Sequence, residues 1–245
     1  MERATNQAAP IVSRPNYRSE LLGLYEQFPF ERHPLWCAVL GQELTHSQIV
    51  QAEVQHYLRT LKARKLRQSA LQMAKSSSES IFELLLQTYL EECTADSTGP
   101  SHLDLIKRLV LVGGYTEDDL AKAEMTPGNA AAVALYRDIT RRGPACHMLG
   151  AGTVEYYYSK LSPKIFEAYT TKYKMSHEQA ETYEIHGPID QLHAERAFTI
   201  LDEAVVIHGW REIKRAVRDA FVATSLHYDG MLQAATGQIS YWNGE

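Results

Sequence analysis

The sequence of 245 residues is poor in cysteine and has no long apolar run. Its three cysteines, Cys37, Cys93 and Cys146, lie far apart without C-x2-C spacing, which argues against a disulfide framework and against a cysteine-rich zinc site. No apolar run approaches the roughly 18 to 20 residues that span a bilayer, and no charged and then apolar leader opens the sequence. We therefore expect a cytoplasmic protein in a reducing compartment.

Basic patches are also missing. The formal net charge of -5 is spread along the sequence, and no cluster of lysine and arginine carries interleaved aromatic residues. Nucleic acid and anionic membranes are therefore not expected as partners. A small molecule or another protein is the expected partner.

Strand signals are almost absent, whereas apolar residues recur at intervals of three and four over most of the sequence. Turn-forming residues predict breaks at 28–34, 75–78, 94–101, 113–116, 126–128, 142–144 and 162–163. Thr116, followed by three acidic residues, is typical of a helix start. The pattern predicts one all-α domain of seven or eight helices over residues 16–245, preceded by a loose arm at residues 1–15.

His186, Asp190 and His193 form an H-x3-D-x2-H run in a helical stretch. Residues at positions i, i+4 and i+7 lie on one face of an α-helix, because both steps approximate whole turns. Two imidazoles and a carboxylate are ligands that non-haem iron favours, whereas structural zinc usually takes cysteine. The run is therefore a candidate metal-binding motif, and a solvated polar stripe is the alternative.

Further candidate ligands lie on other helices. Glu155 is embedded among aromatic and aliphatic residues, where a carboxylate needs a metal ion or a polar partner such as arginine or tyrosine. Glu91 and Glu92 end an apolar helix, and His102 follows after a glycine-proline loop. The alternative is that Glu91 and Glu92 form a solvated helix end and that His102 is a residue beside a helix cap.

Glu53 and His56 form an E-x2-H pair, the unit that ferritin-like di-iron bundles use on two separate helices. The other such pair, Glu43 and His46, lies only ten residues earlier. Two pairs so close in the sequence cannot face each other from separate long helices. The ferritin-like arrangement is therefore rejected, and these four residues are expected to line a pocket or lie on the surface.

Two segments resemble the haem-oxygenase-like di-iron oxidases, which share a seven-helix fold with the thiaminase TenA and quinone-synthase PqqC families. HPLWCAVLGQELTHSQIVQAEVQHYL is similar to the first helix pair of these proteins, and LVGGYTEDDL resembles their glycine turn and acidic helix start. The resemblance covers roughly residues 21–206. It implies a single-domain haem-oxygenase-like bundle, although members that bind no metal share both segments.

The metal motif of that family is a Glu at a helix end, a His after a loop, a Glu on a later helix and then H-x3-D-x2-H. The resemblance places Glu92, His102, Glu155, His186, Asp190 and His193 in these six positions, and Glu91 remains the alternative to Glu92. It implies two irons per chain, with dioxygen as co-substrate. One iron would take Glu92, His102 and His193. The other would take His186 and Asp190, with Glu155 bridging or nearby. The resemblance also implies that Glu92, Glu155 and Asp190 are the catalytic carboxylates.

Two features depart from the family pattern. Gly187 and Pro188 interrupt the metal-binding run, so this helix is expected to be kinked or to start afresh there, which makes His186 the least secure ligand. Cys146 falls near the nucleophilic cysteine of the thiaminases, but Gly150 stands where their tyrosine would follow. We therefore expect Cys146 to be an ordinary buried thiol.

The resemblance implies an oxygen-dependent oxidation of a small substrate, in the first place a free amino acid or derivative in natural-product biosynthesis, by a homodimer. The outcomes known in the family include desaturation, ring closure, C–C cleavage and N-oxygenation. A metal-free TenA-like or PqqC-like enzyme, a fatty-acid decarboxylating di-iron oxidase and a non-catalytic binding protein are the alternatives. Arg196 is a candidate carboxylate anchor, and the Tyr156 to Tyr158 run is expected to direct at least one phenol inward beside Glu155.

Overall fold

The computed structural model describes residues 16–94 and 99–245, so the arm expected at residues 1–15 lies outside the described residues. Two short 3-10 segments, Leu24–Gln27 and Phe30–Arg32, follow the first α-helix. The α-helices of the described residues are α1 (Tyr17–Gly23), α2 (Pro34–Gly41), α3 (His46–Lys75), α4 (Glu79–Cys93), α5 (His102–Val112), α6 (Glu117–Lys122), α7 (Pro127–Arg141), α8 (Pro144–Glu167), α9 (His177–Thr199), α10 (Leu201–His208) and α11 (Trp210–Thr236).

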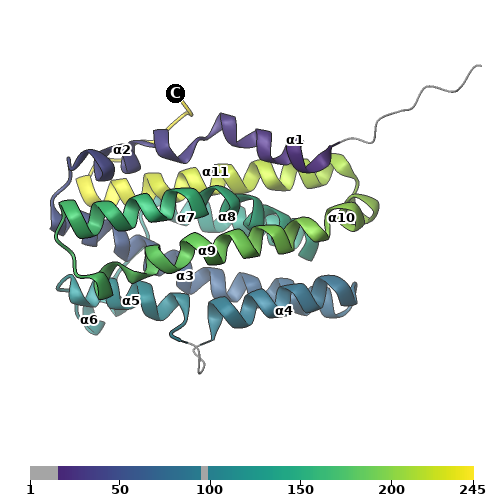
Figure 1. Ribbon diagram of the computed structural model, residues 1–245, viewed down its shortest axis with the longest axis horizontal. Helices are drawn as coiled ribbons and strands as arrows, with labels where there is room; N and C mark the ends of the chain where they lie inside the picture. The colour runs from purple at the N-terminus through teal and green to yellow at the C-terminus, as the bar shows by residue number, and fades with distance from the viewer. Residues whose placement is uncertain (1–15, 95–98) are drawn as a thin grey trace, which may run out of the picture.

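The long helices run roughly along one direction; α2 and α6 lie near one end of the bundle, α10 lies near the other, and α1 runs along its side (Figure 1). The seven helices longer than ten residues, α3, α4, α5, α7, α8, α9 and α11, correspond to the expected seven or eight. One hydrophobic core joins them, with members from α1 to α11. The all-α prediction is therefore confirmed, and no described helix is both long and apolar enough to cross a membrane.

Side-chain caps fix the helix starts that matter for the site. The Ser101 hydroxyl accepts a hydrogen bond from the Asp104 backbone N–H, and the Asp104 carboxylate accepts one from the Ser101 N–H, which forms a capping box. His102 is therefore the first residue of α5. Thr116 and Asp119 form the same box at α6, as the sequence predicts.

Small residues in the Gly150 to Gly152 segment allow α8 to lie close to its neighbours. A Cβ atom placed on Gly152 would lie 2.3 Å from the Cβ of Ala197 in α9. A Cβ on Gly150 would lie 3.2 Å from the Cβ of Ala220 in α11. The α8 and α9 backbones can therefore approach closely, and these two helices carry four of the candidate ligands.

The break expected at residues 162–163 is wrong, because α8 continues through Pro163 to Glu167 and then forms a π turn, Ala168–Lys172. Likewise, α9 does not start afresh at Pro188 but runs through it without interruption. Each proline removes one backbone hydrogen bond, but packing between the two helices compensates. Ser162 donates a hydrogen bond to the Tyr183 carbonyl at 2.7 Å, and a Cβ on Gly187 would lie 3.2 Å from Pro163.

Candidate metal centre

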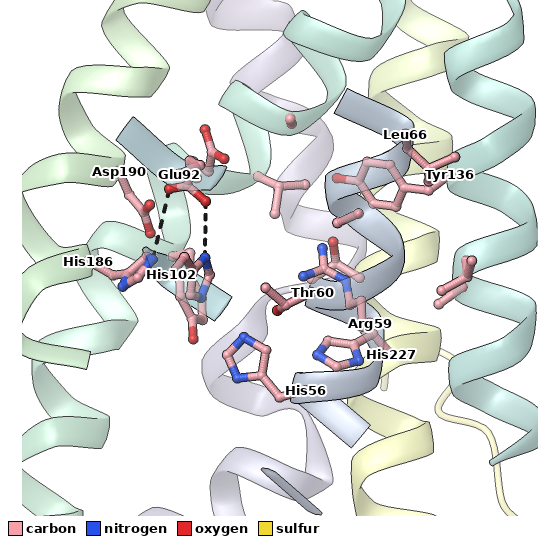
Figure 2. A pocket seen from close by; sticks show the side chains of 18 of the residues that line it. His56, Arg59, Thr60, Leu66, Glu92, His102, Tyr136, His186, Asp190 and His227 are labelled. Carbon is pink, nitrogen blue, oxygen red and sulfur yellow. Dashed lines mark hydrogen bonds and ion pairs between the residues drawn. The ribbon is translucent and has the colours of Figure 1, made fainter. Parts of the chain in front are cut away.

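The six candidate ligands come from four helices. Glu92 lies at the end of α4, His102 begins α5, Glu155 lies in the middle of α8, and His186, Asp190 and His193 form one face of α9. Figure 2 shows Glu92, His102, His186 and Asp190 pointing toward one another from these helices. Residues separated by as many as 101 positions, from Glu92 to His193, thus meet in the interior.

Glu92 belongs to two groups of ligand atoms, each compact enough to hold a metal ion. The first contains Glu92, His102 and His186, and the second contains Glu92, Asp190 and His193; in each group the atoms lie within 4.8 Å of one another. This differs from the partition that the resemblance implies, because His186 and His193 exchange places. The reason is that α5 packs against the N-terminal end of the α9 stripe, where the His102 and His186 rings lie 4.0 Å apart.

His186 is oriented by its own helix. Its Nδ1 donates a hydrogen bond to the Thr182 carbonyl at 2.5 Å, which leaves the lone pair on Nε2. That Nε2 is buried, has no hydrogen-bond partner among the described residues and lies 4.0 Å from Glu92 Oε1. Burial lowers the pKa of His186, which favours the neutral ring that a metal ion requires.

His193 is oriented by Glu91, the residue that the sequence left as an alternative to Glu92. The His193 Nε2 donates to Glu91 Oε2 at 3.0 Å, so its lone pair lies on Nδ1. That Nδ1 is buried, has no hydrogen-bond partner in the described part of the chain, and lies 3.6 Å from Glu92 Oε1 and 3.9 Å from Glu155 Oε2. Glu91 therefore supports a ligand from behind, an arrangement common for metal-binding histidines.

Arg196, expected as a possible substrate anchor, is already bound. Its guanidinium donates to Glu91 at 2.7 and 3.0 Å and to the Thr88 hydroxyl at 2.7 Å. The Arg196 side chain is also buried. It therefore holds Glu91 in place beneath His193 and has no free face for a ligand.

The remaining ligands have electrostatic surroundings that suit a cation. Two effects lower the pKa of His102 to about 3. Burial is the larger, and repulsion from the charge that His186 would carry when protonated is the second. The His102 ring is therefore neutral at pH 7. Burial, followed by the charges of Glu155 and Glu92, raises the pKa of Asp190 well above its ordinary value. Asp190 Oδ2 is buried and has no hydrogen-bond partner among the residues described. Carboxylates crowded in this way favour a divalent ion.

Arg67 of α3 is the member of the site that sequence reasoning missed. Its guanidinium donates to Glu92 Oε2 at 2.8 Å and to Glu155 Oε1 at 3.2 Å. Burial raises the pKa of Glu92, but Arg67 and His102 lower it more, so its pKa lies well below the ordinary carboxyl value. No spacing in the sequence links Arg67 to these carboxylates, because the contact depends on how α3 packs against α4 and α8.

The residues fit an iron centre. Buried polar atoms without hydrogen bonds are costly, and three of them, His186 Nε2, Asp190 Oδ2 and His193 Nδ1, belong to residues of the two ligand groups. Imidazole and carboxylate ligands without cysteine match non-haem iron. The geometry thus places five of the six residues that the resemblance names in the two ligand groups, and Glu155 lies beside the second group, 3.9 Å from His193 Nδ1.

A cavity opens beside the ligands. The space between its lining side chains, with the open solvent at its mouth included, amounts to about 990 Å³. Glu92, His102, Glu155, His186 and Asp190 contribute to its wall. The ligands therefore face a chamber in which a substrate can reach them.

Three of the four residues of the E-x2-H pairs, His56, Glu43 and His46, lie as expected in the pocket or on the surface, whereas Glu53 is buried and is not part of the cavity wall. His56 lines the cavity, and its Nδ1 bonds Glu53 Oε2 at 3.1 Å. Glu53 is fully buried and also accepts hydrogen bonds from the Tyr169 and Tyr183 hydroxyls. Glu43 and His46 are exposed.

The tyrosine run and Cys146 also match their expectations. Tyr158 lines the cavity together with Glu155, whereas Tyr157 stacks on Tyr25 and donates to the Leu22 carbonyl. Cys146 is fully buried, and burial raises the pKa of its thiol to about 11. Such a thiol is a poor nucleophile at neutral pH.

Fold and site together define an all-α protein whose interior presents histidines and carboxylates suited to non-haem iron. A family model described as iron-containing redox enzyme, with the haem-oxygenase-like fold, matches residues 53–228, which is more than half of the chain. The chain belongs to this family of iron-containing redox enzymes. The matched range contains all six candidate ligands.

Solved structures of several other proteins have the same fold. A CADD-like protein of unknown function from Nostoc punctiforme has a TM-score of 0.73 at 13% identity, covering 91% of this chain and 97% of that one. A domain of unknown function with a heme oxygenase-like fold from Shewanella denitrificans has a TM-score of 0.70 at 15% identity, covering 89% of each chain. A TenA homolog from Pseudomonas syringae has a TM-score of 0.67 at 12% identity, covering 92% and 98%.

At these identities the structural matches establish the haem-oxygenase-like fold alone. No curated protein sequence matches the chain. The chemistry must therefore be argued from the site itself.

Proposed function

We propose that the chain is a non-haem di-iron oxidase or oxygenase that uses dioxygen to oxidise a small organic substrate, in the first place a free amino acid or derivative. The observation that carries this proposal is the pair of three-residue groups that share Glu92. A single structural ion would need only one such group. Two adjacent groups beside a cavity suit a dinuclear centre whose open positions face a substrate.

The ligand sets follow from the geometry. Glu92, His102 and His186 would hold one iron, and Glu92, Asp190 and His193 would hold the other. Glu155, whose Oε2 lies 3.9 Å from His193 Nδ1, stands beside the second set. When bound, the two irons would supply electrons for the reduction of dioxygen.

The chain itself would orient the ligands and keep water away. Thr182 and Glu91 fix which nitrogen of His186 and of His193 carries the lone pair, so that both lone pairs are aimed at the centre before a metal arrives. Apolar side chains from α3, α7 and α8, including Leu66, Val133 and Val154, form part of the cavity wall. They would hold an apolar part of the substrate near the ligands and exclude bulk water.

Oxygen uptake after anaerobic loading with ferrous iron tests the proposal. We expect one class among amino acids and fatty acids to accelerate oxygen consumption, and a strong chelator or the His186→Ala variant to abolish this acceleration. His46→Ala, which changes an exposed histidine, is the matched control and should behave as the wild type. Turnover that is unaffected by chelation would support a metal-free TenA-like or PqqC-like enzyme instead.

A further inference from the structure

Arg59 of α3 lies on the cavity wall opposite the candidate metal ligands. Figure 2 shows Arg59, with Thr60 and His227 near it, on the side of the cavity away from His186 and Asp190. The other arginines inside this region, Arg67 and Arg196, both bind glutamates.

By contrast, Arg59 forms no ion pair or hydrogen bond with the described residues. Its guanidinium carbon lies over the Tyr136 ring, 5.6 Å from the ring centroid. A partly buried guanidinium that faces a chamber without a carboxylate partner retains its full capacity to bind an anion.

Polar groups that complement a bound anion or its neighbouring atoms surround Arg59. The Thr60 hydroxyl is buried and has no hydrogen-bond partner within the described part of the chain. His227 donates from Nδ1 to the Asn129 amide oxygen at 3.0 Å, which leaves a lone pair on Nε2. Burial first, and Arg59 second, lower the pKa of His227, so its ring is neutral. This end of the cavity thus combines one cation, one free hydroxyl and one neutral acceptor.

The two ends of the cavity have opposite electrostatic character. At one end lie the carboxylates Glu92, Glu155 and Asp190, and Arg67 forms ion pairs with the first two. The charges of Arg67 and Arg59 both lower the pKa of Asp190, but burial and the two glutamates raise it more. At the other end Arg59 forms no ion pair with a carboxylate of the described residues. The wall between the two ends includes apolar side chains, among them Ala63 and Leu66 of the same helix. A molecule with an anionic head and an aliphatic body matches this distribution.

We propose that Arg59 binds the carboxylate of the substrate, so that the substrate lies with its carboxylate away from the metal centre and its aliphatic end toward it. For an amino acid, the ammonium group would donate to the Thr60 hydroxyl and to His227 Nε2. The inference rests on the proposed function in that it takes the cavity as the substrate site. The expected substrate is therefore an aliphatic carboxylate that is oxidised at a carbon remote from its carboxylate. This orientation differs from that of a decarboxylating oxidase.

Calorimetric binding of small probes to the full-length protein tests this orientation. The probes are hexanoate with its neutral analogue hexanamide, and L-norleucine with L-norleucinamide, each measured on metal-free protein and after anaerobic loading with ferrous iron. We expect each carboxylate to bind both forms of the protein, and to bind more tightly than its amide. Arg59→Gln should weaken carboxylate binding at least about tenfold and leave amide binding unchanged. Arg59→Lys, which keeps the charge, should lose less.

The exposed Arg64, on the same helix and outside the cavity wall, provides the matched control, and Arg64→Gln should bind all four probes as the wild type does. Thermal unfolding of each variant checks that it is folded. If Arg59→Gln does not fold, Arg59→Lys is compared with the wild type instead.

The proposal that Arg59 binds the substrate carboxylate is wrong if Arg59→Gln binds hexanoate as tightly as the wild type or if the wild type binds none of the carboxylates. It is also wrong if hexanoate binds only after iron loading. The last result would place the carboxylate on the metal. Failure of the proposed function is a separate result, since it would show as an absence of iron binding while the Arg59 effect persisted.

Discussion

Glu92 is the residue on which the candidate centre depends. It belongs to both ligand groups, accepts a hydrogen bond from Arg67 and is bonded to His102 Nδ1 at 3.0 Å. A carboxylate has two oxygens and can bridge two cations. The adjacent Glu91 points instead to His193 and Arg196, so two consecutive glutamates have different tasks.

The supporting task of Glu91 leads to a prediction. Glu91→Gln removes the charge that holds His193 Nε2 and Arg196 but leaves every candidate ligand in place. We expect the affinity for ferrous iron to fall by roughly 10–100-fold, as is usual when the partner of a metal-binding histidine is lost. A titration against a competing chelator measures this. Glu83→Gln, at an exposed position of the same helix, is the control; equal affinities for the two variants would contradict the role of Glu91.

Arg67 leads to a second prediction, about the metal-free protein. Its guanidinium compensates Glu92 and Glu155, so Arg67→Met would leave two crowded carboxylates without a cation. We expect the unfolding free energy of the metal-free protein to fall by about 3 kcal/mol, the lower end for a broken buried pair, since the Arg67 side chain is 17% exposed. Bound iron should restore part of this loss, and therefore raise the Tm more in the variant than in the wild type.

Urea denaturation of the metal-free proteins measures the first effect, and thermal unfolding with and without metal measures the second. Arg64→Met, at the exposed position on the same helix, should change neither quantity. A metal-free Arg67→Met protein as stable as the wild type would show that Arg67 does not compensate these carboxylates.

At the scale of elements, the contact between α8 and α9 positions the centre. These helices carry Glu155 and the three α9 ligands, and Gly152 allows them to meet closely. Pro163 and Pro188 lie inside the two helices without ending either of them. The sequence does not reveal this tolerance, because it comes from packing between the helices and not from the local propensity of either one.

Gly152 leads to a prediction at this scale. Gly152→Ala would place a Cβ 2.3 Å from that of Ala197, so α8 and α9 must move apart. We expect the unfolding free energy to fall by about 1–3 kcal/mol despite the better helix propensity of alanine. Thermal or urea unfolding measures the change. Gly23→Ala is the control, since Gly23 is helical with open space around it; a Gly152→Ala protein as stable as that control would contradict the close contact.

At the scale of the whole molecule, the chain encloses a cavity whose two ends differ in charge. The metal ligands and Arg67 form one end, and Arg59, Thr60 and His227 form the other. All of them come from helices of one core. In the proposed orientation of the substrate, the fold would set the distance between the bound carboxylate and the carbon that is oxidised.

The sequence predicted that His186, Asp190 and His193 lie together, because helical spacing alone puts them on one face of α9. It could not predict which candidate ligands group together, since that depends on the packing of α5 against α9. Nor could it identify Arg67 or Arg59, because an arginine in a long helix is usually exposed to solvent. Their position inside the protein becomes evident only once the neighbouring helices are placed. The general helical pattern and the start of α8 were predictable from periodicity and turn-forming residues, whereas the C-terminal end of α8 was not, because packing outweighs the effect of a single proline.

The number of ferrous ions bound per chain under anaerobic conditions tests the central claim most directly. A titration followed by removal of free metal and iron analysis should give two irons per chain for the wild type, and neither should be held firmly by Glu92→Gln, because both ligand groups contain Glu92. One iron or none in the wild type, or two irons in Glu92→Gln, would contradict a dinuclear centre that shares this carboxylate.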